Sequence, residues 1–518
     1  MASAPGTAHR HGRPARSRVA VAVLAVLAVL LTACGGGGSA EGGASAGPLR
    51  IGSVVFPSSL DPAIGTGGSD HMVLYLIYDR LIDQDPETGE LRPGLAESWA
   101  YDETDRRRFT LELRDGVTFQ DGTPLDAAAV VASLQRYQEL GINTELTNVT
   151  GIEAVDAMTV AITLTAEDAA LPAILSDRPG MITSPAAVAE FGDEFAQHPT
   201  GTGPFTVDQI VSGSSITFDE FADYWGDEPE VDRIEWTTYP QVVAMENAAK
   251  GGQLDLAVQI PAADVASLED NPNFTVDVGP SLAYTDVVMI GDLDPFDSPE
   301  IRLAFNHAIN REALLQAVND GEGEIATQAL GSDSPYYSDA AAEYTEYDPE
   351  KARDLVAASG KQNPTFECAF FPGRGVEVAG PLMINDLAEV GMTMTLKQLS
   401  LAQALSDFRE RRVPCLFTSW TGRPDPSLTF ALNFASTGSS NVGKVDLGVD
   451  DLIAQLRSTY DEDERARIGQ EIAEKVAPVT TQVPLLRTSN IVLVGSKVQG
   501  YLAPPSGKPD LRTVSLGG

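Results

Sequence analysis

The second half of the chain alternates short apolar runs with longer amphipathic runs, and this alternation restricts the fold more than any other feature. Runs of strand character occur at Cys368, Met392–Leu399 and Cys415–Trp420. Runs of helical character at Val376–Val390 and Leu401–Arg412 separate them. Strands that alternate with helices in this way form parallel βαβ units. The sequence therefore predicts an α/β fold, in which ligands bind at the carboxyl ends of the strands.

The start of the chain has the pattern of a bacterial export signal. Four arginines between residues 10 and 18 precede the apolar run Val19–Leu31, which is shorter than the roughly 20 residues that a membrane-spanning helix needs. The run ends in Leu31-Thr32-Ala33-Cys34, which resembles the lipobox, where the cysteine receives diacylglycerol and becomes the mature N-terminus. We expect residues 1–33 to be a lipoprotein signal peptide and Cys34 to be lipidated. A secretory signal without lipidation is the alternative.

A tether and an acidic body follow the signal. Residues 34–48 are rich in Gly and Ser, a composition that gives a flexible coil without a core. The chain has 74 acidic and 35 basic residues, and four of the basic residues lie in the signal. This excess of negative charge excludes nucleic acid as a partner, because nucleic acid is itself a polyanion and would be repelled. We expect an extracytoplasmic monomer that is held at the cell membrane by the two acyl chains on Cys34.

Two cysteines lie in the body of the chain. Cys368 is in the run FECAFF and Cys415 is in PCLFTSW, both of strand character. In an oxidising exported setting they can form a disulfide. Such a bond would close a loop of about 48 residues and contribute ~4 kcal/mol on the chain-entropy view. The sequence predicts this bond, and two separate buried thiols are the alternative.

The segment Leu95–Leu125 carries the most specific motif. It starts with LAESW, passes through a strand at Phe109-Thr110-Leu111, and turns at Asp115-Gly116 and again at Asp121-Gly122. In its residues and spacing it resembles the signature of the family 5 extracellular solute-binding proteins, the dipeptide, oligopeptide and nickel type that serve ABC importers.

Further blocks resemble the same family in the same order, and together they extend the resemblance from Leu49 to about Leu502. They are GTGPF at Gly201–Phe205, DYWG at Asp223–Gly226, the strand–helix unit Val231–Leu256, the block Pro299–Asn319 and the helix Tyr347–Gly360.

The resemblance implies a two-lobed periplasmic-binding-protein-like fold (type II, cluster C-like) with an additional small α/β domain. It also implies a receptor that captures a peptide or similar small solute between its lobes and delivers it to an ABC transporter permease. A final strand pair is expected at Pro484–Leu486 and Ile491–Val494. The implied division is lobe I at 49–83, 197–282 and 482–518, the small domain at 84–196, and lobe II at 283–481.

The sequence offers little catalytic apparatus. His71, His198 and His307 lie beyond the signal, and none has the spacing of a zinc site. The nucleophile elbow Gly-x-Ser-x-Gly is absent from the sequence. We therefore expect no catalytic residue, no metal and no cofactor. A ligand-sensing receptor and a surface hydrolase on the same scaffold are the alternative functions.

The richest candidate for binding is Leu416–Phe434, where a strand ends at Trp420 and a Gly/Pro loop follows. In peptide-binding relatives, an Asp shortly after such a Trp pairs with the peptide's amine. Here the third residue after Trp420 is Arg423, and the acid, Asp425, comes two residues later. Arginine cannot bind an ammonium group but can hold a carboxylate or phosphate with two hydrogen bonds. A surface position for Arg423, or an ion pair with Asp425, is the alternative.

Three aromatic residues are further candidates for the ligand cleft. Phe56 follows the first strand, Tyr284 lies near the expected crossing between the lobes, and Phe371 follows the Cys368 strand. For each, a place in the hydrophobic core is the alternative. The predicted ligand contacts are therefore Phe56, Tyr284, Phe371, Trp420, Arg423 and Asp425.

Overall fold

The computed structural model describes residues 47–65, 68–141, 145–372, 375–504, 506–508 and 510–517. The predicted signal peptide, the lipidation site Cys34 and all but the last two residues of the tether lie outside these ranges. In the described ranges, no helix combines the length and the apolar character that crossing a membrane requires.

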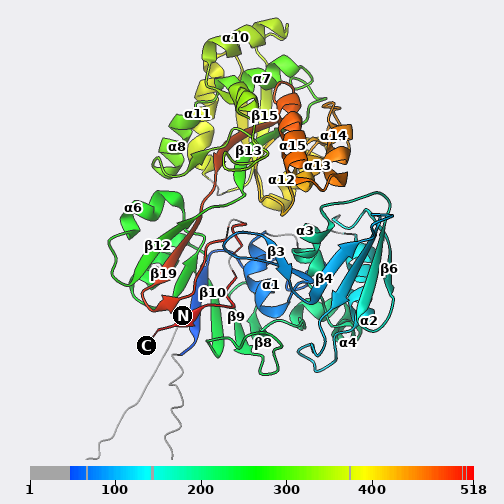
Figure 1. The fold of residues 1–518 in the computed structure, drawn as a ribbon. Helices are drawn as coiled ribbons and strands as arrows, with labels where there is room; N and C mark the ends of the chain where they lie inside the picture. The colour runs from blue at the N-terminus through cyan, green and yellow to red at the C-terminus, as the bar shows by residue number, and fades with distance from the viewer. Residues whose placement is uncertain are drawn as a thin grey trace, which may run out of the picture. The chain divides into compact units, whose positions relative to one another are not determined.

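β1 (Leu49–Ser53) begins a sheet that has seven strands in the described part of the chain (Figure 1). This strand pairs in parallel with β10 and β11, whereas the other neighbours in the sheet are antiparallel. Ile51, Phe218 and Trp236 are almost fully buried in the core between this sheet and helix α1. We call this sheet and its helices the seven-stranded unit. Its strands in spatial order are β12 (Phe274–Gly279), β19 (Asn490–Gly495), β11 (Leu256–Val258), β1, β10 (Arg233–Thr238), β9 (Ser215–Glu220) and β8 (Phe205–Val211), and its helices are α1 (His71–Ile77), α5 (Val242–Lys250) and α6 (Val265–Leu268).

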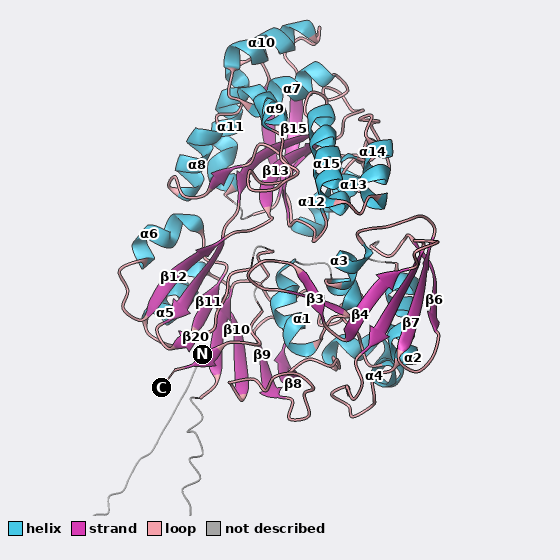
Figure 2. Cartoon of the chain, viewed as in Figure 1, coloured by secondary structure: helices cyan, strands magenta, loops and turns pink. Residues whose placement is uncertain are grey.

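A smaller antiparallel sheet, with four strands among the described residues, lies beside α2 (Figure 2). Buried Phe109 and Leu111 alternate with more exposed residues, so one face of the sheet packs against α2. The Asp126 side chain caps the start of α2, and Gly141 in the left-handed conformation ends it. We call this the four-stranded unit. Its elements are β4 (Ala96–Tyr101), β5 (Arg108–Leu113), β7 (Thr159–Leu164), β6 (Val149–Ala154), α2 (Ala127–Leu140), α3 (Leu171–Leu175) and α4 (Pro185–Phe191), and the short pairs β2 (Ile82–Gln84) with β3 (Leu91–Pro93) and β20 (Val498–Gln499) with β21 (Ser515–Leu516) stand apart from it.

The third sheet has six strands within the described ranges, and helices cover both of its faces (Figure 1). Val287 and Met289 of β13 pack with α7, α8, α10 and α11, whereas Tyr284 of the same strand packs with α13, α14 and α15. We call this the six-stranded unit. Its strands in spatial order are β14 (Glu324–Ile325), β18 (Gln482–Arg487), β13 (Tyr284–Met289), β17 (Cys415–Trp420), β15 (Thr365–Phe370) and β16 (Thr393–Gln398), and its helices are α7 (Pro299–Ala308), α8 (Arg311–Asn319), α9 (Asp339–Ala342), α10 (Pro349–Ala358), α11 (Val376–Glu389), α12 (Leu401–Arg409), α13 (Pro426–Phe434), α14 (Asp450–Ser458) and α15 (Glu462–Val476).

The predicted βαβ pattern is confirmed in this unit. β15 is parallel to both β16 and β17, and α11 and α12 connect the three strands in sequence. The carboxyl end of β17 is Trp420, so the loop that follows lies at the edge where α/β sheets bind ligands.

Both predicted final strands are present, as β18 and β19, but the two strands do not pair with each other. β18 joins the six-stranded sheet beside β13, whereas β19 joins the seven-stranded sheet between β11 and β12. All six residues of β18 are buried, and their backbone groups are satisfied by pairing with β13. The segment that was assigned to lobe I from residue 482 therefore starts with a strand of the other sheet, and the chain crosses between the sheets after Arg487.

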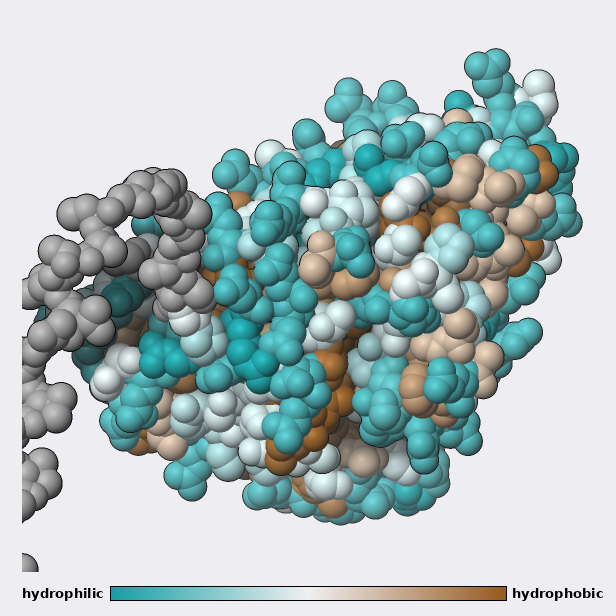
Figure 3. All heavy atoms as spheres, turned by 90° about the horizontal axis from the view of Figure 1, so that it is seen from below, coloured by the Kyte–Doolittle hydropathy of each residue, from teal (hydrophilic) through white to brown (hydrophobic). Residues whose placement is uncertain are grey.

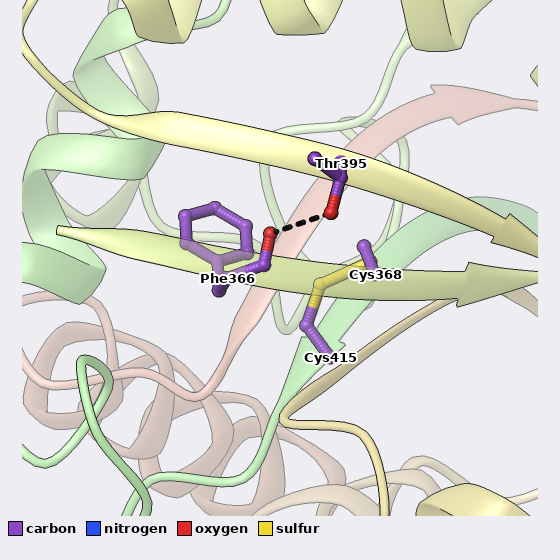
Figure 4. The surroundings of a disulfide bond; sticks show 4 residues. All are labelled: Phe366, Cys368, Thr395 and Cys415. Atoms are coloured by element: carbon purple, nitrogen blue, oxygen red, sulfur yellow. Dashed lines mark hydrogen bonds between the residues drawn. A yellow bond between two sulfur atoms is a disulfide. The ribbon is translucent and has the colours of Figure 1, made fainter.

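Cys368 of β15 and Cys415 of β17 are directly opposite each other on adjacent parallel strands, and a disulfide joins them (Figure 4). Both residues are fully buried. Nearby, the Thr395 hydroxyl of β16 donates to the backbone oxygen of Phe366 at 3.4 Å. The bond thus joins two neighbouring strands inside the core of the six-stranded unit.

One face of the surface is mostly hydrophilic. The face drawn in Figure 3 is covered mainly by hydrophilic side chains, with apolar ones gathered in narrow strips. This distribution is ordinary for a water-exposed protein.

Candidate ligand-binding site

Three neighbouring strands of the six-stranded sheet bring Trp420, Tyr284 and Arg487 into one row. Tyr284, the first residue of β13, lies opposite Trp420 of β17 on one side and opposite Arg487 of β18 on the other. Residues directly opposite each other on adjacent strands project from the same face of a sheet. The row therefore places two aromatic rings and a cation on one face, at the edge where β17 ends.

The loop after Trp420 folds a second cation back over this row. The guanidinium carbon of Arg423 lies 4.9 Å from the centre of the Trp420 ring, within the range of a cation–π interaction. Gly422 makes the turn possible, because it has φ 66° and a β-carbon there would lie 2.4 Å from the Cβ of Leu282. The turn thus presses the loop against the crossing between the sheets and directs Arg423 along the Trp420 ring.

Asp425 does not pair with Arg423. Its Oδ1 accepts a hydrogen bond from the backbone N of Ser427 at 2.8 Å, which caps α13, and its Oδ2 accepts from Nη2 of Arg465 at 2.6 Å. Asp425 and Arg465 are both buried. The carboxylate is therefore fixed by the protein itself, and Asp425 does not line either of the two cavities described next.

The first cavity lies where the chain crosses between the two large sheets. It is open to solvent, and the space between its walls together with its mouth amounts to about 830 Å³. Arg423 and Arg487 both line it, together with the aliphatic side chains of Leu282 and Leu330. Its remaining lining includes the hydroxyl residues Ser281, Ser334, Thr429, Thr488 and Ser489 and the acids Glu324 and Asp333.

The second cavity shares Leu282, Gly422 and Arg423 with the first. It is smaller, at about 270 Å³, and it is also lined by Tyr75 of the seven-stranded unit and by Lys508 and Asp177. Nζ of Lys508 donates to both carboxylate oxygens of Asp177, at 3.0 and 2.9 Å. Residues of all three units therefore meet around Arg423.

The charged groups around this second cavity shift one another's pKa values. Burial raises the pKa of Asp177, but Lys508 and His71 together outweigh burial and hold the pKa well below its ordinary value. Burial lowers the pKa of Lys508, Asp177 opposes this effect, and the nearby charge of Arg423 adds to it. Burial also lowers the pKa of Arg487. Asp177 is thus held by Lys508 and by Nε2 of His71, whereas the two arginines face the cavities.

None of the four predicted aromatic candidates is among the residues that line the two cavities, and Trp420 reaches the site only through its contact with Arg423. Phe56 is half-buried and packs against the core of the seven-stranded unit. Tyr284 is fully buried, and its hydroxyl lies 3.5 Å from Oε1 of Gln482. Phe371 packs against the cluster around α12. Tyr284 nevertheless contributes indirectly, because the guanidinium carbon of Arg487 lies 5.8 Å from the centre of its ring.

Sequence reasoning missed Arg487, Lys508 and Tyr75. Arg487 ends an otherwise apolar strand, QVPLLR, and a charge at the end of a buried strand is a signal that could have identified it. Lys508 lies in a Gly/Pro-containing loop near the C-terminus, and Tyr75 lies in an apolar helix, so neither carries a local signal. In the described ranges, no group of three or more His, Cys, Asp or Glu side chains is placed to hold a metal ion.

Comparison with known proteins decides the family. The sequence profile of the bacterial extracellular solute-binding proteins, family 5, matches residues 90–441. The chain belongs to this family. A relative is the glutathione-binding protein GsiB of Escherichia coli O1:K1, which is 29% identical over 469 residues, an alignment that covers 86% of this chain and 90% of GsiB.

Solved structures share the fold of this solute-binding protein. The ABC transporter-associated periplasmic binding protein DppA of Helicobacter pylori, in complex with the peptide STSA, superposes with a TM-score of 0.82 at 24% identity, covering 91% of this chain and 98% of DppA. The binding protein AgaA of A. tumefaciens R10, in complex with agropinic acid, gives a TM-score of 0.82 at 24% identity, covering 91% and 99%. The fold is therefore that of the type II periplasmic binding proteins, as predicted. These relatives are binding proteins, and this family member is likewise a solute-binding protein and not an enzyme.

Proposed function

We propose that the protein is the solute receptor of an ABC importer and that it captures a peptide or similar small solute in the cavities around Arg423. The observation that carries this proposal is the open cavity lined by Arg423 and Arg487 at the carboxyl end of β17, where the chain crosses between the two large sheets. Family membership supports it, since GsiB is a glutathione-binding protein and DppA is associated with an ABC transporter.

In this proposal the seven-stranded unit is lobe I, the six-stranded unit is lobe II, and the four-stranded unit is the small domain. The lobes are joined where β12 leads into β13 and where β18 leads into β19. Short crossings of this kind act as hinges in proteins that close around a ligand. A solute that contacts both lobes stabilises the closed form and raises stability by RT ln(1 + [L]/Kd).

The receptor works as a monomer outside the cytoplasm, and a lipid on Cys34 holds it at the membrane beside its permease. Replacing the thiol with a hydroxyl in Cys34→Ser removes the acylation site. We expect this variant to appear in the culture medium, while the wild-type protein stays with the membrane fraction. Solute affinity should be unchanged, because the predicted anchor is remote in sequence from every cavity residue. Retention of the variant in the membrane fraction would contradict the lipid anchor.

The test of solute binding begins with mass spectrometry of small molecules that are released from the natively purified protein. A thermal-shift screen of peptides, sugars and metal chelates follows, and capture on the immobilised permease is measured with and without the solute found. A solute that raises the melting temperature and increases capture by the permease is the expected result. Failure of every solute class to shift the melting temperature would overturn the proposal, and solute-dependent capture by a sensor kinase in place of the permease would assign the protein to signalling.

A further inference from the structure

Arg423 has no acidic partner in the described part of the chain. Its Nη1 donates to the backbone oxygen of Gly422 at 3.1 Å, and its Nε is buried without a hydrogen-bond partner. The neighbouring acids pair with other cations, Asp425 with Arg465 and Asp177 with Lys508. A buried donor on a charged group that lacks a partner is costly, and such groups often mark a missing ligand.

Arg487 repeats this arrangement in the lining of the same cavity. Only 8% of Arg487 is exposed, and its Nε is also buried without a hydrogen-bond partner. Its Nη2 donates to the backbone oxygen of Gln328 at 3.1 Å. The carboxylate of Glu324 comes no closer than 3.8 Å and is 47% exposed, so water screens it. Arg487 is therefore nine-tenths buried, charged, and incompletely paired.

Aromatic rings fix both guanidinium groups in place. Arg423 lies over Trp420 and Arg487 over Tyr284, and these two rings are neighbours in the row across β17 and β13. A guanidinium group that is held against a ring loses less freedom when it binds a ligand, and its planar donor pair matches the two oxygens of a carboxylate. The cavity thus presents two preorganised donors with positive charge.

The cavity linings offer few free acidic groups that could bind a cation. Asp425 is engaged by Arg465 and by the start of α13, and Asp177 is engaged by Lys508. The remaining acids of the lining, Glu324 and Asp333, are exposed to water. A buried carboxylate suited to an ammonium group is therefore lacking among the described residues that line these cavities.

We propose that Arg423 and Arg487 form a carboxylate subsite, so that the solute is an organic acid or acidic amino-acid derivative held by its negative end and not by a free amine. The hydroxyl groups of Thr429, Thr488 and Ser489 surround this end of the cavity and bind further oxygens of the solute. The inference rests on the proposed function, because it names the chemistry of the solute that the same cavity captures. The site is thus positively charged where a site that recognises a peptide through its amine is negatively charged.

The test uses three small probes of similar length that differ only in charge: succinate, its neutral diamide succinamide, and 1,4-diaminobutane. Each is added to the full mature protein at millimolar concentration, with sodium chloride holding the ionic strength constant. Melting temperature and binding isotherms are measured for each probe, and inorganic phosphate is included to separate a carboxylate subsite from a phosphate subsite. We expect succinate to raise the melting temperature and the other two organic probes to leave it unchanged.

Variants assign the effect to the two arginines. Arg423→Gln removes the charge from a loop residue and should weaken succinate binding by more than tenfold, whereas Arg423→Lys should retain part of the affinity. Arg487→Lys keeps the charge but loses the paired donors, and it should also weaken binding. The control is Arg353→Gln, which removes an exposed arginine from α10 of the same unit and should bind succinate as the wild type does.

The outcomes separate this inference from the proposed function. Equal succinate affinity in Arg423→Gln and wild type, or stronger stabilisation by phosphate than by succinate, would overturn the carboxylate subsite. Binding of only neutral or cationic solutes would also overturn it, yet it would leave a solute receptor in place. Failure of all solute classes, the probes included, would remove both.

Discussion

Arg457, in the last turn of α14, holds Asp168 of the four-stranded unit with two hydrogen bonds, Nε to Oδ1 at 2.9 Å and Nη2 to Oδ2 at 2.6 Å. Next to this pair, the rings of Tyr101 and Tyr460 meet at 5.1 Å, and the guanidinium carbon of Arg106 lies 4.2 Å from the centre of the Tyr460 ring. The carboxylate of Asp168 is almost completely buried. These contacts join the small domain to the helices of the six-stranded unit at a place separate from the cavities around Arg423.

Removing this contact should destabilise the protein. Arg457→Ala leaves the buried carboxylate of Asp168 without its charged partner, and we expect the free energy of unfolding to fall by about 2–3 kcal/mol. The matched control is Arg467→Ala in α15, because Arg467 is 55% exposed and its pairs with Glu464 and Glu471 are on the surface. Such pairs contribute roughly 0–1 kcal/mol. Urea denaturation measures both variants, and equal losses in the two would contradict the importance of the Asp168 contact.

The disulfide should contribute strongly to stability. Cys368 and Cys415 are separated by 47 positions, so the bond restricts a long loop of the unfolded chain. The chain-entropy relation gives about 4 kcal/mol for a loop of this length. We expect the free energy of unfolding of the double variant Cys368→Ala/Cys415→Ala, measured by urea denaturation, to be lower by that amount, while solute binding is retained. Alkylation of the unreduced wild-type protein, followed by mass spectrometry, should modify neither cysteine, and modification of both would contradict the bond.

Asp286 should make stability depend on pH. It lies on β13, it is 2% exposed, and its Oδ1 has no hydrogen-bond partner. Burial raises its pKa from the ordinary 3.8 to about 8. In the unfolded chain the group loses its proton near pH 4, whereas in the folded chain it keeps the proton until about pH 8. The folded state therefore binds one more proton than the unfolded state between these pH values. Its free energy of unfolding is highest below pH 4 and falls as the pH rises towards 8.

The variant Asp286→Asn removes this dependence because the amide does not ionise. We expect the variant and the wild type to have similar unfolding free energies at pH 4, and the variant to become more stable by roughly a few kcal/mol as the pH approaches 8. Urea denaturation at intervals between pH 4 and pH 8 measures the difference. A difference that stays constant over this range would show that Asp286 titrates normally.

Much of the fold could be predicted from the sequence, because the patterns that indicate helices and strands are local. The βαβ order, the capped helix α2 and the alternation in β5 each follow from residues that are close together in the chain. The partners of β18 and β19 could not be predicted in this way. Both strands are short and apolar, and only pairing with β13 or β11 decides which sheet each joins. Pairing between distant segments leaves no mark in the local pattern.

The same distinction between local patterns and distant contacts applies to the candidate site. Arg423 could be identified because it stands near Trp420 in a loop that follows a strand. Arg487 escaped notice because it enters the cavity through its pairing with Tyr284, a residue of a distant segment. Asp425 lies in the expected loop, yet its carboxylate is engaged by Arg465, a partner 40 positions later in the chain. The sequence therefore predicted the residue types and their place in the loop. It could not predict the partners of each charged group, and these partners decide whether the group is free to bind a ligand.

Trp420 offers a direct optical test of the site. Its indole ring lies beneath the guanidinium group of Arg423, and its Nε1 is buried without a hydrogen-bond partner. A carboxylate that binds Arg423 changes the charge above the ring, so we expect the emission of Trp420 to change in intensity or wavelength when succinate binds. The measurement uses a variant in which Trp99, Trp225 and Trp236 are replaced by Phe, leaving Trp420 as the sole tryptophan.

The control for this signal is the same variant with Arg423→Gln added. Titration of the sole-tryptophan variant should give a saturable change whose midpoint agrees with the affinity from binding isotherms. The added Arg423→Gln change should abolish it, because the ring no longer lies beside a charge that the ligand neutralises. Emission that stays constant at saturating succinate would place Trp420 outside the site, even if succinate binds elsewhere in the cavity. An equal change with and without Arg423 would instead show that the ring senses closure of the lobes and not the bound carboxylate.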